Sequence, residues 1–125
     1  MQDAELYGQG FAGSLGIPSL SYMGEAGAGA TVTLIVENSS GVDNAAGYLF
    51  VGTSEVSIPT RGGGEIVCSN DVAFDRIRLE PGLNTISLTL PTDLDVDKVC
   101  VQVLQQDSGS KGGYAMTRGM KISLD

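Results

Sequence analysis

Three carboxylates at alternate positions form the set of residues whose spacing comes closest to a metal site. Asp93, Asp95 and Asp97 lie in a polar connection, and carboxylates spaced in this way in a loop can surround Ca²⁺. They do not make an EF-hand, because Lys98 stands where that loop needs a turn glycine and Leu104 where it needs a bidentate glutamate. Two alternatives stay open: a calcium site of another kind, and an acidic loop that only discourages edge pairing.

The two cysteines, Cys68 and Cys100, both fall in segments with strand character. A disulfide between them would close a loop whose entropy contributes about 3–4 kcal/mol, and it would suit an oxidising compartment. Alternatively, both thiols stay reduced and act as small buried apolar groups. The sequence leaves both states open.

The chain contains no histidine, which removes most of the residue sets that enzymes use at neutral pH. A Ser-His-Asp triad, a Cys-His pair and a histidine-bearing zinc site are all impossible. A glycosidase needs only two carboxyl groups, but the glutamates fall in turns or exposed strand positions without an aromatic sugar platform nearby: Glu25, Glu37, Glu55, Glu65 and Glu80. Tryptophan is absent as well. We therefore predict that the protein is not an enzyme and uses no cofactor, Ca²⁺ excepted.

The chain has 15 acidic residues against 7 basic ones, a net charge of -8. This charge repels nucleic acid and anionic lipid, so we expect neither as a partner. No apolar run approaches the roughly 20 residues of a membrane helix, and the first residues lack the basic and apolar regions of a signal peptide. If the protein is secreted, we expect that its signal peptide has been removed.

Residues 98–107 give the clearest strand pattern in the chain. Three valines at positions 99, 101 and 103 fall on one face, and Cys100, Gln102 and Leu104 fall on the other. A strand that alternates in this way has successive side chains on opposite faces of its sheet. We expect a strand with one buried face, the valine face.

Short segments with strand character recur about every ten residues, separated by Gly, Pro, Asn and Asp, and no window has helical periodicity. They are 30–37, 48–51, 55–58, 65–68, 73–79, 84–90, 98–107, 114–117 and 120–124. The pattern predicts an all-β fold, a single antiparallel β-sandwich of jelly-roll-like or immunoglobulin-like form with about eight or nine short strands. One domain is expected over residues 1–125, with 1–20 as a glycine-rich extended N-terminal segment.

A series of glycines and strand motifs resembles a known bacterial module. The motifs are Tyr7-Gly8-x-Gly10-x-x-Gly13, Pro18-x-Leu20, the strand at 31–36, the apolar strand before Gly52, Ile58-Pro59 leading to Gly62-Gly63-Gly64, Leu88-x-Leu90-Pro91, and Gln102 followed by Asp107 and Gly112-Gly113. They are similar to a glycine-rich β-sandwich module, usually C-terminal, of secreted and cell-surface proteins of planctomycetes and related bacteria. The resemblance implies an extracytoplasmic module without known catalysis. The chain departs from it by its acidity, by its three alternate aspartates, by Gln105-Gln106 at usually apolar positions and by standing alone, which leaves open whether it is a module or an assembling subunit.

Two functions fit this sequence. The first, which we favour, is a secreted structural or adhesive role, in which the N-terminal segment adds as a strand to a neighbouring sheet of another copy or another surface protein. Leu6, Tyr7 and Phe11 are the candidate assembly residues. The second is a module that binds carbohydrate or another small ligand, with or without Ca²⁺. The aromatic residues are expected to fill the core or its rim: Tyr7, Phe11, Tyr22, Tyr48, Phe50, Phe74 and Tyr114.

Overall fold

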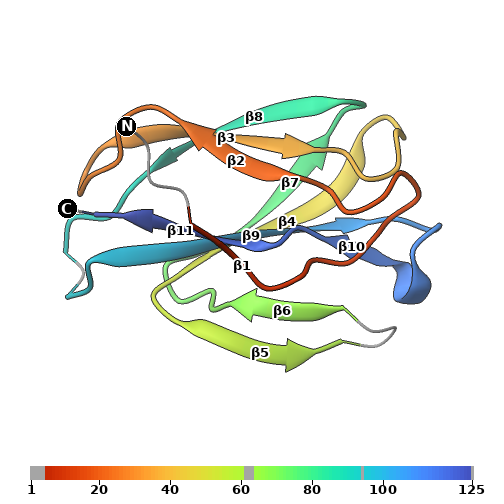
Figure 1. The fold of residues 1–125 in the computed structure, drawn as a ribbon. Helices are drawn as coiled ribbons and strands as arrows, with labels where there is room; N and C mark the ends of the chain where they lie inside the picture. Colours follow the sequence, from red (N-terminus) through yellow and green to blue (C-terminus); the bar gives the residue numbers. More distant parts are fainter. Residues whose placement is uncertain (1–4, 61–63, 94, 125) are drawn as a thin grey trace.

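Strand β9 (Lys98–Gln106) lies in the middle of the larger sheet of the fold (Figure 1). The computed structural model describes residues 5–60, 64–93 and 95–124. These residues form eleven strands, and all of the pairings between them are antiparallel. The predicted all-β antiparallel sandwich is therefore confirmed. It has more strands than the roughly eight or nine expected, because the N-terminal part adds two short ones, β1 (Glu5–Tyr7) and β2 (Leu20–Met23).

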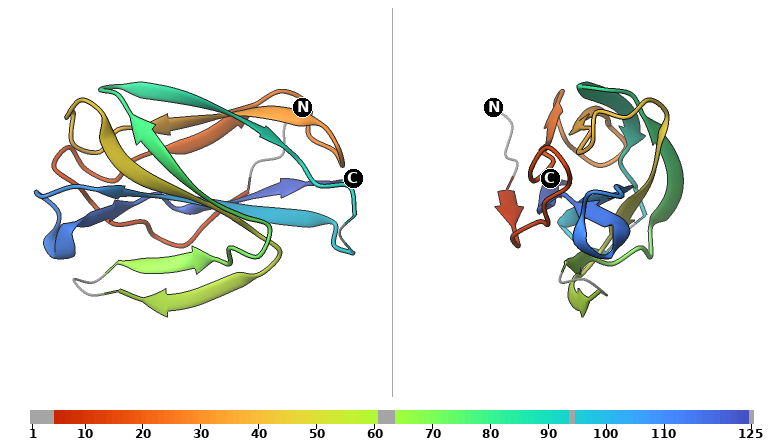
Figure 2. Two further views of the ribbon diagram at one scale, coloured as in Figure 1. Left: turned by 180° about the vertical axis from the view of Figure 1, so that it is seen from behind. Right: turned by 90° about the vertical axis from the view of Figure 1, so that its right-hand side faces the viewer.

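The strands form two sheets and a separate hairpin, which Figures 1 and 2 show as three layers with the larger sheet in the middle. The larger sheet has the order β1, β11 (Gly119–Ser123), β9, β4 (Ala45–Gly52) and β7 (Ala73–Leu79), and β10 (Tyr114–Met116) also pairs with β9. The smaller sheet has the order β2, β3 (Thr31–Glu37) and β8 (Leu83–Thr89). The hairpin consists of β5 (Glu55–Pro59) and β6 (Glu65–Cys68), and a 3-10 helix, η1 (Lys111–Gly113), precedes β10.

The main core lies between the two sheets. Val32, Leu34 and Val36 of β3 belong to one buried cluster with the three valines of β9, as the alternation in both strands predicts. Burying an apolar side chain of this size contributes about 1.5–3 kcal/mol. The valine face of β9 is therefore the inner face of the sandwich.

The outer face of β9 is buried as well, and here the prediction of a half-buried strand is wrong. The β5–β6 hairpin lies over this face (Figure 2) and encloses a second buried cluster, formed by Phe50, Cys68, Cys100, Leu104 and Met116. A strand covered on both faces needs apolar or fully hydrogen-bonded side chains on both. The sequence conceals this because a glutamine stands in the middle of the outer face.

That residue, Gln102, is fully buried and holds the hairpin to the sheet. Its Oε1 accepts a hydrogen bond from the Val67 N–H at 2.9 Å, and its Nε2 donates to the carbonyl oxygens of Glu65 and Thr117, both at 3.2 Å. A buried amide costs little when its groups are paired in this way. Gln102 therefore connects β6 to β9, two strands that do not pair through their backbones.

Most of the expected strands are found within a few residues of their predicted bounds. Strand β2 was not expected, because its alternation lasts only four residues: Leu20 and Tyr22 are buried, and Ser21 and Met23 are exposed. In the motif that follows Ile58-Pro59, Gly62 and Gly63 lie outside the described residues. Within the described part of the chain, no helix is long and apolar enough to reach across a lipid bilayer.

Candidate functional site

An aromatic groove is open on the outer face of the larger sheet, beside the β5–β6 hairpin. Its volume is about 460 Å³. The described residues that line it are Tyr48, Phe50, Thr60, Phe74, Leu104, Gly112, Tyr114 and Met116. Ligand sites of globular proteins are typically concave, mostly apolar and roughly 300–1,000 Å³ in volume. The groove has these properties.

Strand pairing brings the aromatic residues of the groove together. Phe50 of β4 lies opposite Phe74 of β7, and Tyr48, two residues before Phe50, lies opposite Leu104 of β9. Tyr114 enters from β10, which pairs with the far side of β9. Residues directly opposite each other, and residues two apart on one strand, point to the same face of a sheet. Four strands therefore present these side chains to one surface.

The aromatic rings of the groove are fixed by one another. The Phe74 ring stacks on the Tyr48 ring, with centroids 5.5 Å apart and planes 24° from parallel, and it meets the Phe50 ring edge to face at 5.1 Å. Both arrangements are favourable for aromatic pairs. Phe50 is 8% exposed, whereas Phe74 is 54% exposed. Phe74 is thus an exposed flat apolar surface that its neighbours hold in place.

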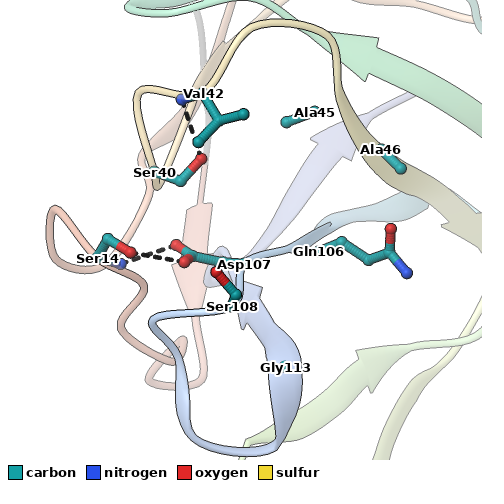
Figure 3. A pocket seen from close by; sticks show the side chains of 9 residues that line it. All are labelled: Ser14, Ser40, Val42, Ala45, Ala46, Gln106, Asp107, Ser108 and Gly113. Atoms are coloured by element: carbon teal, nitrogen blue, oxygen red, sulfur yellow. Dashed lines mark hydrogen bonds between the residues drawn. The ribbon is translucent and has the colours of Figure 1, made fainter.

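A second hollow, of about 450 Å³, surrounds Asp107 at the end of β9 (Figure 3). Asp107 is 3% exposed, and its carboxylate accepts four hydrogen bonds: from Ser14 N and Oγ at 2.7 Å, from Ser39 Oγ at 2.8 Å and from Gly109 N at 2.9 Å. Burial opposes its charge, but these donors outweigh burial and lower the pKa of Asp107. Its lone pairs are already used within the chain, so this carboxylate anchors loops and is poorly placed to act as a general base.

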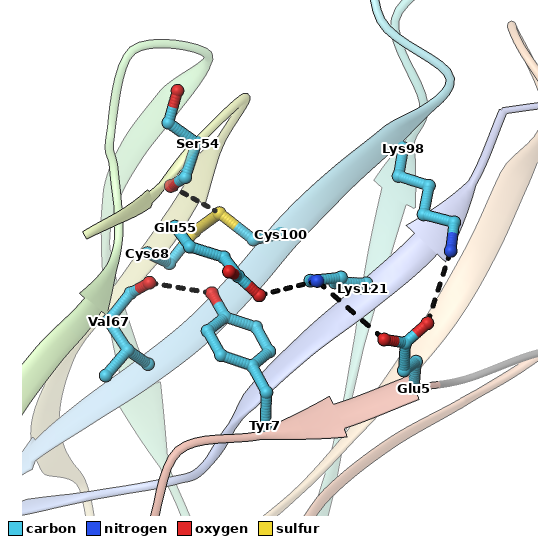
Figure 4. Close-up of polar contacts among 9 residues, drawn as sticks. All are labelled: Glu5, Tyr7, Ser54, Glu55, Val67, Cys68, Lys98, Cys100 and Lys121. Atoms are coloured by element: carbon cyan, nitrogen blue, oxygen red, sulfur yellow. Dashed lines mark hydrogen bonds and ion pairs between the residues drawn. A yellow bond between two sulfur atoms is a disulfide. The ribbon is translucent and has the colours of Figure 1, made fainter. Parts of the chain in front are cut away.

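The N-terminal strand is tied to its own sheet (Figure 4). The Tyr7 hydroxyl donates to the Val67 carbonyl at 2.7 Å, and burial, with a contribution from Glu55, raises the pKa of Tyr7 to about 12. Lys98 pairs with Glu5 at 3.2 Å, and this hydrogen bond lowers the pKa of Glu5. Lys121 pairs with Glu5 and Glu55, and its hydrogen bond to Glu55 raises the pKa of Lys121.

The candidate assembly residues therefore lie against their own chain. Leu6 is opposite Met120 in the pairing of β1 with β11, and it is partly exposed. Tyr7 and Phe11 pack on the second buried cluster, and Phe11 exchanges two backbone hydrogen bonds with Met116. In this structure the N-terminal segment completes its own sheet, so addition to a neighbour would first require its release.

The three alternate aspartates are not assembled into a metal site. Asp93, Asp95 and Asp97 are all exposed, and the carboxylate of Asp93 accepts a hydrogen bond from Thr92. Among the described residues, no group of three or more His, Cys, Asp or Glu side chains is placed to hold a metal ion.

Cys68 and Cys100 are joined by a disulfide, with their Cα atoms 5.7 Å apart (Figure 4). The bond lies on the Gln102 face of β9, at the end of β6. It therefore fastens the hairpin beside the aromatic groove at a point separate from the Gln102 hydrogen bonds.

The sequence interpretation missed the groove because it expected the aromatic residues to fill the core or its rim. One signal was present: Tyr48 and Phe50 lie two apart on an apolar strand, and Phe74 is followed at two-residue intervals by Arg76 and Arg78. The decisive information is the pairing of β4 with β7 and of β9 with β10, which no local pattern contains. Comparison with known proteins adds nothing, since no protein-family model, curated protein or solved structure is significantly similar to the chain.

Proposed function

We propose that this chain is a non-catalytic extracellular module that adheres to carbohydrate through the aromatic groove. The observation that carries the proposal is the stacked pair of Tyr48 and Phe74, because Phe74 is 54% exposed although neighbouring rings fix its position. Contact between an apolar ring surface and water is unfavourable, so covering the ring lowers the free energy. A ligand with a flat apolar face would cover it.

Sugar rings have such a face. The axial C–H groups of a pyranose form an apolar surface that carries partial positive charge, and the face of an aromatic ring is negative. The polar groups at the edge of the groove, the Thr60 hydroxyl and the backbone of η1, are suited to the sugar hydroxyls that surround this surface. The Thr60 hydroxyl already donates to the Gly64 carbonyl at 2.8 Å, so it has lone pairs left to accept.

The non-catalytic part of the proposal rests on the titratable groups. The sequence contains no histidine, and none of the described residues that line the groove is acidic. Glu55 is held by Lys121, and Asp107 by its four donors. A hydrolase of glycosidic bonds would need two carboxyl groups across the bound sugar.

The extracellular part is supported by the disulfide, which persists in oxidising compartments, and by the resemblance to secreted bacterial modules. Carbohydrate binding also accounts for adhesion without a released N-terminal strand. An adhesive role therefore remains part of the proposal, with the groove as the contact surface in place of β1.

The test is binding of the protein to a panel of immobilised polysaccharides, with Phe74→Ala compared to the wild type. Leu83→Ala is the matched control, because Leu83 is an exposed apolar residue of β8 in the smaller sheet. We expect Phe74→Ala to weaken binding by about tenfold or more, equivalent to about 1.4 kcal/mol, and Leu83→Ala to have no effect. Absence of binding by the wild type, or equal binding by Phe74→Ala, would contradict the proposal.

A further inference from the structure

The side chains of two arginines on β7 make no polar contact with the described part of the chain. Arg76 and Arg78 pair with β4 through their backbones, but their side chains are exposed and form no hydrogen bond or ion pair with the described residues. Other cationic side chains are used within the molecule: Lys98 and Lys121 pair with carboxylates, and Arg118 donates to the Gly8 carbonyl at 2.9 Å. The guanidinium groups of Arg76 and Arg78 are therefore available to a ligand.

These arginines stand on the same face as the aromatic groove. Arg76 lies two residues from Phe74 on β7 and directly opposite Tyr48 on β4, where opposing Cβ atoms are about 4.5–5.5 Å apart. Arg78 continues the same row. On the β10 side of the groove, the exposed Lys111 adjoins Gly112, which lines it.

The described residues that line the groove are uncharged, and exposed cationic residues stand beside it. The chain carries a net charge of -8, yet cationic residues flank the groove and no described residue that lines it is acidic. Cationic side chains beside an uncharged groove attract anionic groups locally, even on a protein whose net charge is negative. Guanidinium groups bind carboxylates and sulfates through two parallel hydrogen bonds.

We propose, on the basis of the proposed function, that the groove selects acidic glycans. A sugar ring stacks on the Tyr48–Phe74 pair, and a carboxylate or sulfate group on the same or the next sugar is bound by Arg76, with Arg78 extending the contact along the glycan. The aromatic pair provides affinity for the sugar ring, and the arginines provide specificity for sugars that carry an anionic group.

Two matched pairs of polysaccharides test this selection: polygalacturonate against its methyl ester, and dextran sulfate against dextran. The first pair differs in carboxylate and the second in sulfate, so together they distinguish the two anions. The variants are Arg76→Gln and Arg78→Gln. Lys98→Gln is the control, because it removes one positive charge from an exposed residue at the opposite end of β9. A single-stranded oligonucleotide serves as the competing polyanion.

We expect the wild type to bind at least one anionic member about tenfold or more tightly than its neutral partner. Arg76→Gln should abolish this preference, Arg78→Gln should reduce it, and Lys98→Gln should leave it intact. Added salt should weaken the binding of the anionic polysaccharide in each pair and leave the binding of the neutral one unchanged. If the two members of each pair bind with equal affinity, and Phe74→Ala weakens this binding, the selection of acidic glycans is wrong and carbohydrate binding by the groove is still supported. Binding to neither pair nor to the wider panel would overturn both proposals, and tighter binding to the oligonucleotide would overturn the choice of glycan.

Discussion

Phe50 and Phe74 lie opposite each other on β4 and β7, and their rings meet edge to face with centroids 5.1 Å apart. They differ in exposure, 8% against 54%, so truncation should have unequal effects. We expect Phe50→Ala to lower the free energy of unfolding by about 3–5 kcal/mol. Phe74→Ala should lower it by about 1 kcal/mol, mainly through lost ring pairing. Urea denaturation of the two variants measures the difference, and equal losses would identify Phe74 as a core residue and not as a binding surface.

The Asp107 carboxylate should make stability depend on pH at the acid end. Its folded pKa is lowered, so its contribution is complete above the unfolded value of about 3.9 and is lost as pH falls through the folded value. Asp107→Asn should cost about 1–3 kcal/mol at neutral pH, because an amide cannot accept all four hydrogen bonds. It should also flatten the decline in stability below about pH 4.

Denaturant unfolding between pH 2 and 7 measures both the loss of stability at neutral pH and the decline of stability in acid. Asp93→Asn is the matched control, because this exposed carboxylate accepts a single hydrogen bond from Thr92, and substitutions at such positions usually stay within about 0.5 kcal/mol. If Asp107→Asn is as stable as the control variant, the four hydrogen bonds make no net contribution to the free energy of unfolding.

The disulfide links residues 32 apart in sequence, so reduction should lower the free energy of unfolding by about 3–4 kcal/mol through the entropy of the unfolded chain. The measurement is denaturant unfolding with and without reductant, accompanied by a thiol assay. The double variant Cys68→Ala, Cys100→Ala should be insensitive to reductant and less stable than the oxidised protein. An unchanged wild-type midpoint after complete reduction would rule out this contribution.

The strand pattern was predictable because it is local. The valines of β9 and the alternation in β3 and β8 place the inner faces correctly, since each strand carries its own two-residue period. The antiparallel sandwich follows from these strands and from the turn residues between them.

The buried polar residues and the groove were not predictable because each depends on partners distant in the chain. Asp107 is bound by Ser14, 93 residues before it, and Gln102 by Val67, 35 residues before it. In the sequence both look like solvent-exposed polar positions. The groove likewise requires β7 to lie beside β4 and not beside β8, its neighbour in sequence. Only the order of strands in the sheet supplies that information.

Tyr7 tests whether the N-terminal strand acts within its own chain. Its folded pKa is raised to about 12 from an unfolded value of about 10, so its contribution is present below pH 10 and is lost as pH rises from about 10 to about 12. Tyr7→Phe should remove the hydrogen bond to Val67, cost about 1 kcal/mol and remove one late-titrating phenol from the ultraviolet titration. The molecular mass in solution should not change, because β1 pairs with β11 of the same molecule. Gly119→Ala supplies the matching backbone test: a methyl group there would overlap the Tyr7 ring and its hydroxyl, so it should lower stability by displacing the whole side chain while the phenol is still present to titrate. A change of oligomeric state in either variant, with stability unaltered, would instead show that this strand joins separate molecules.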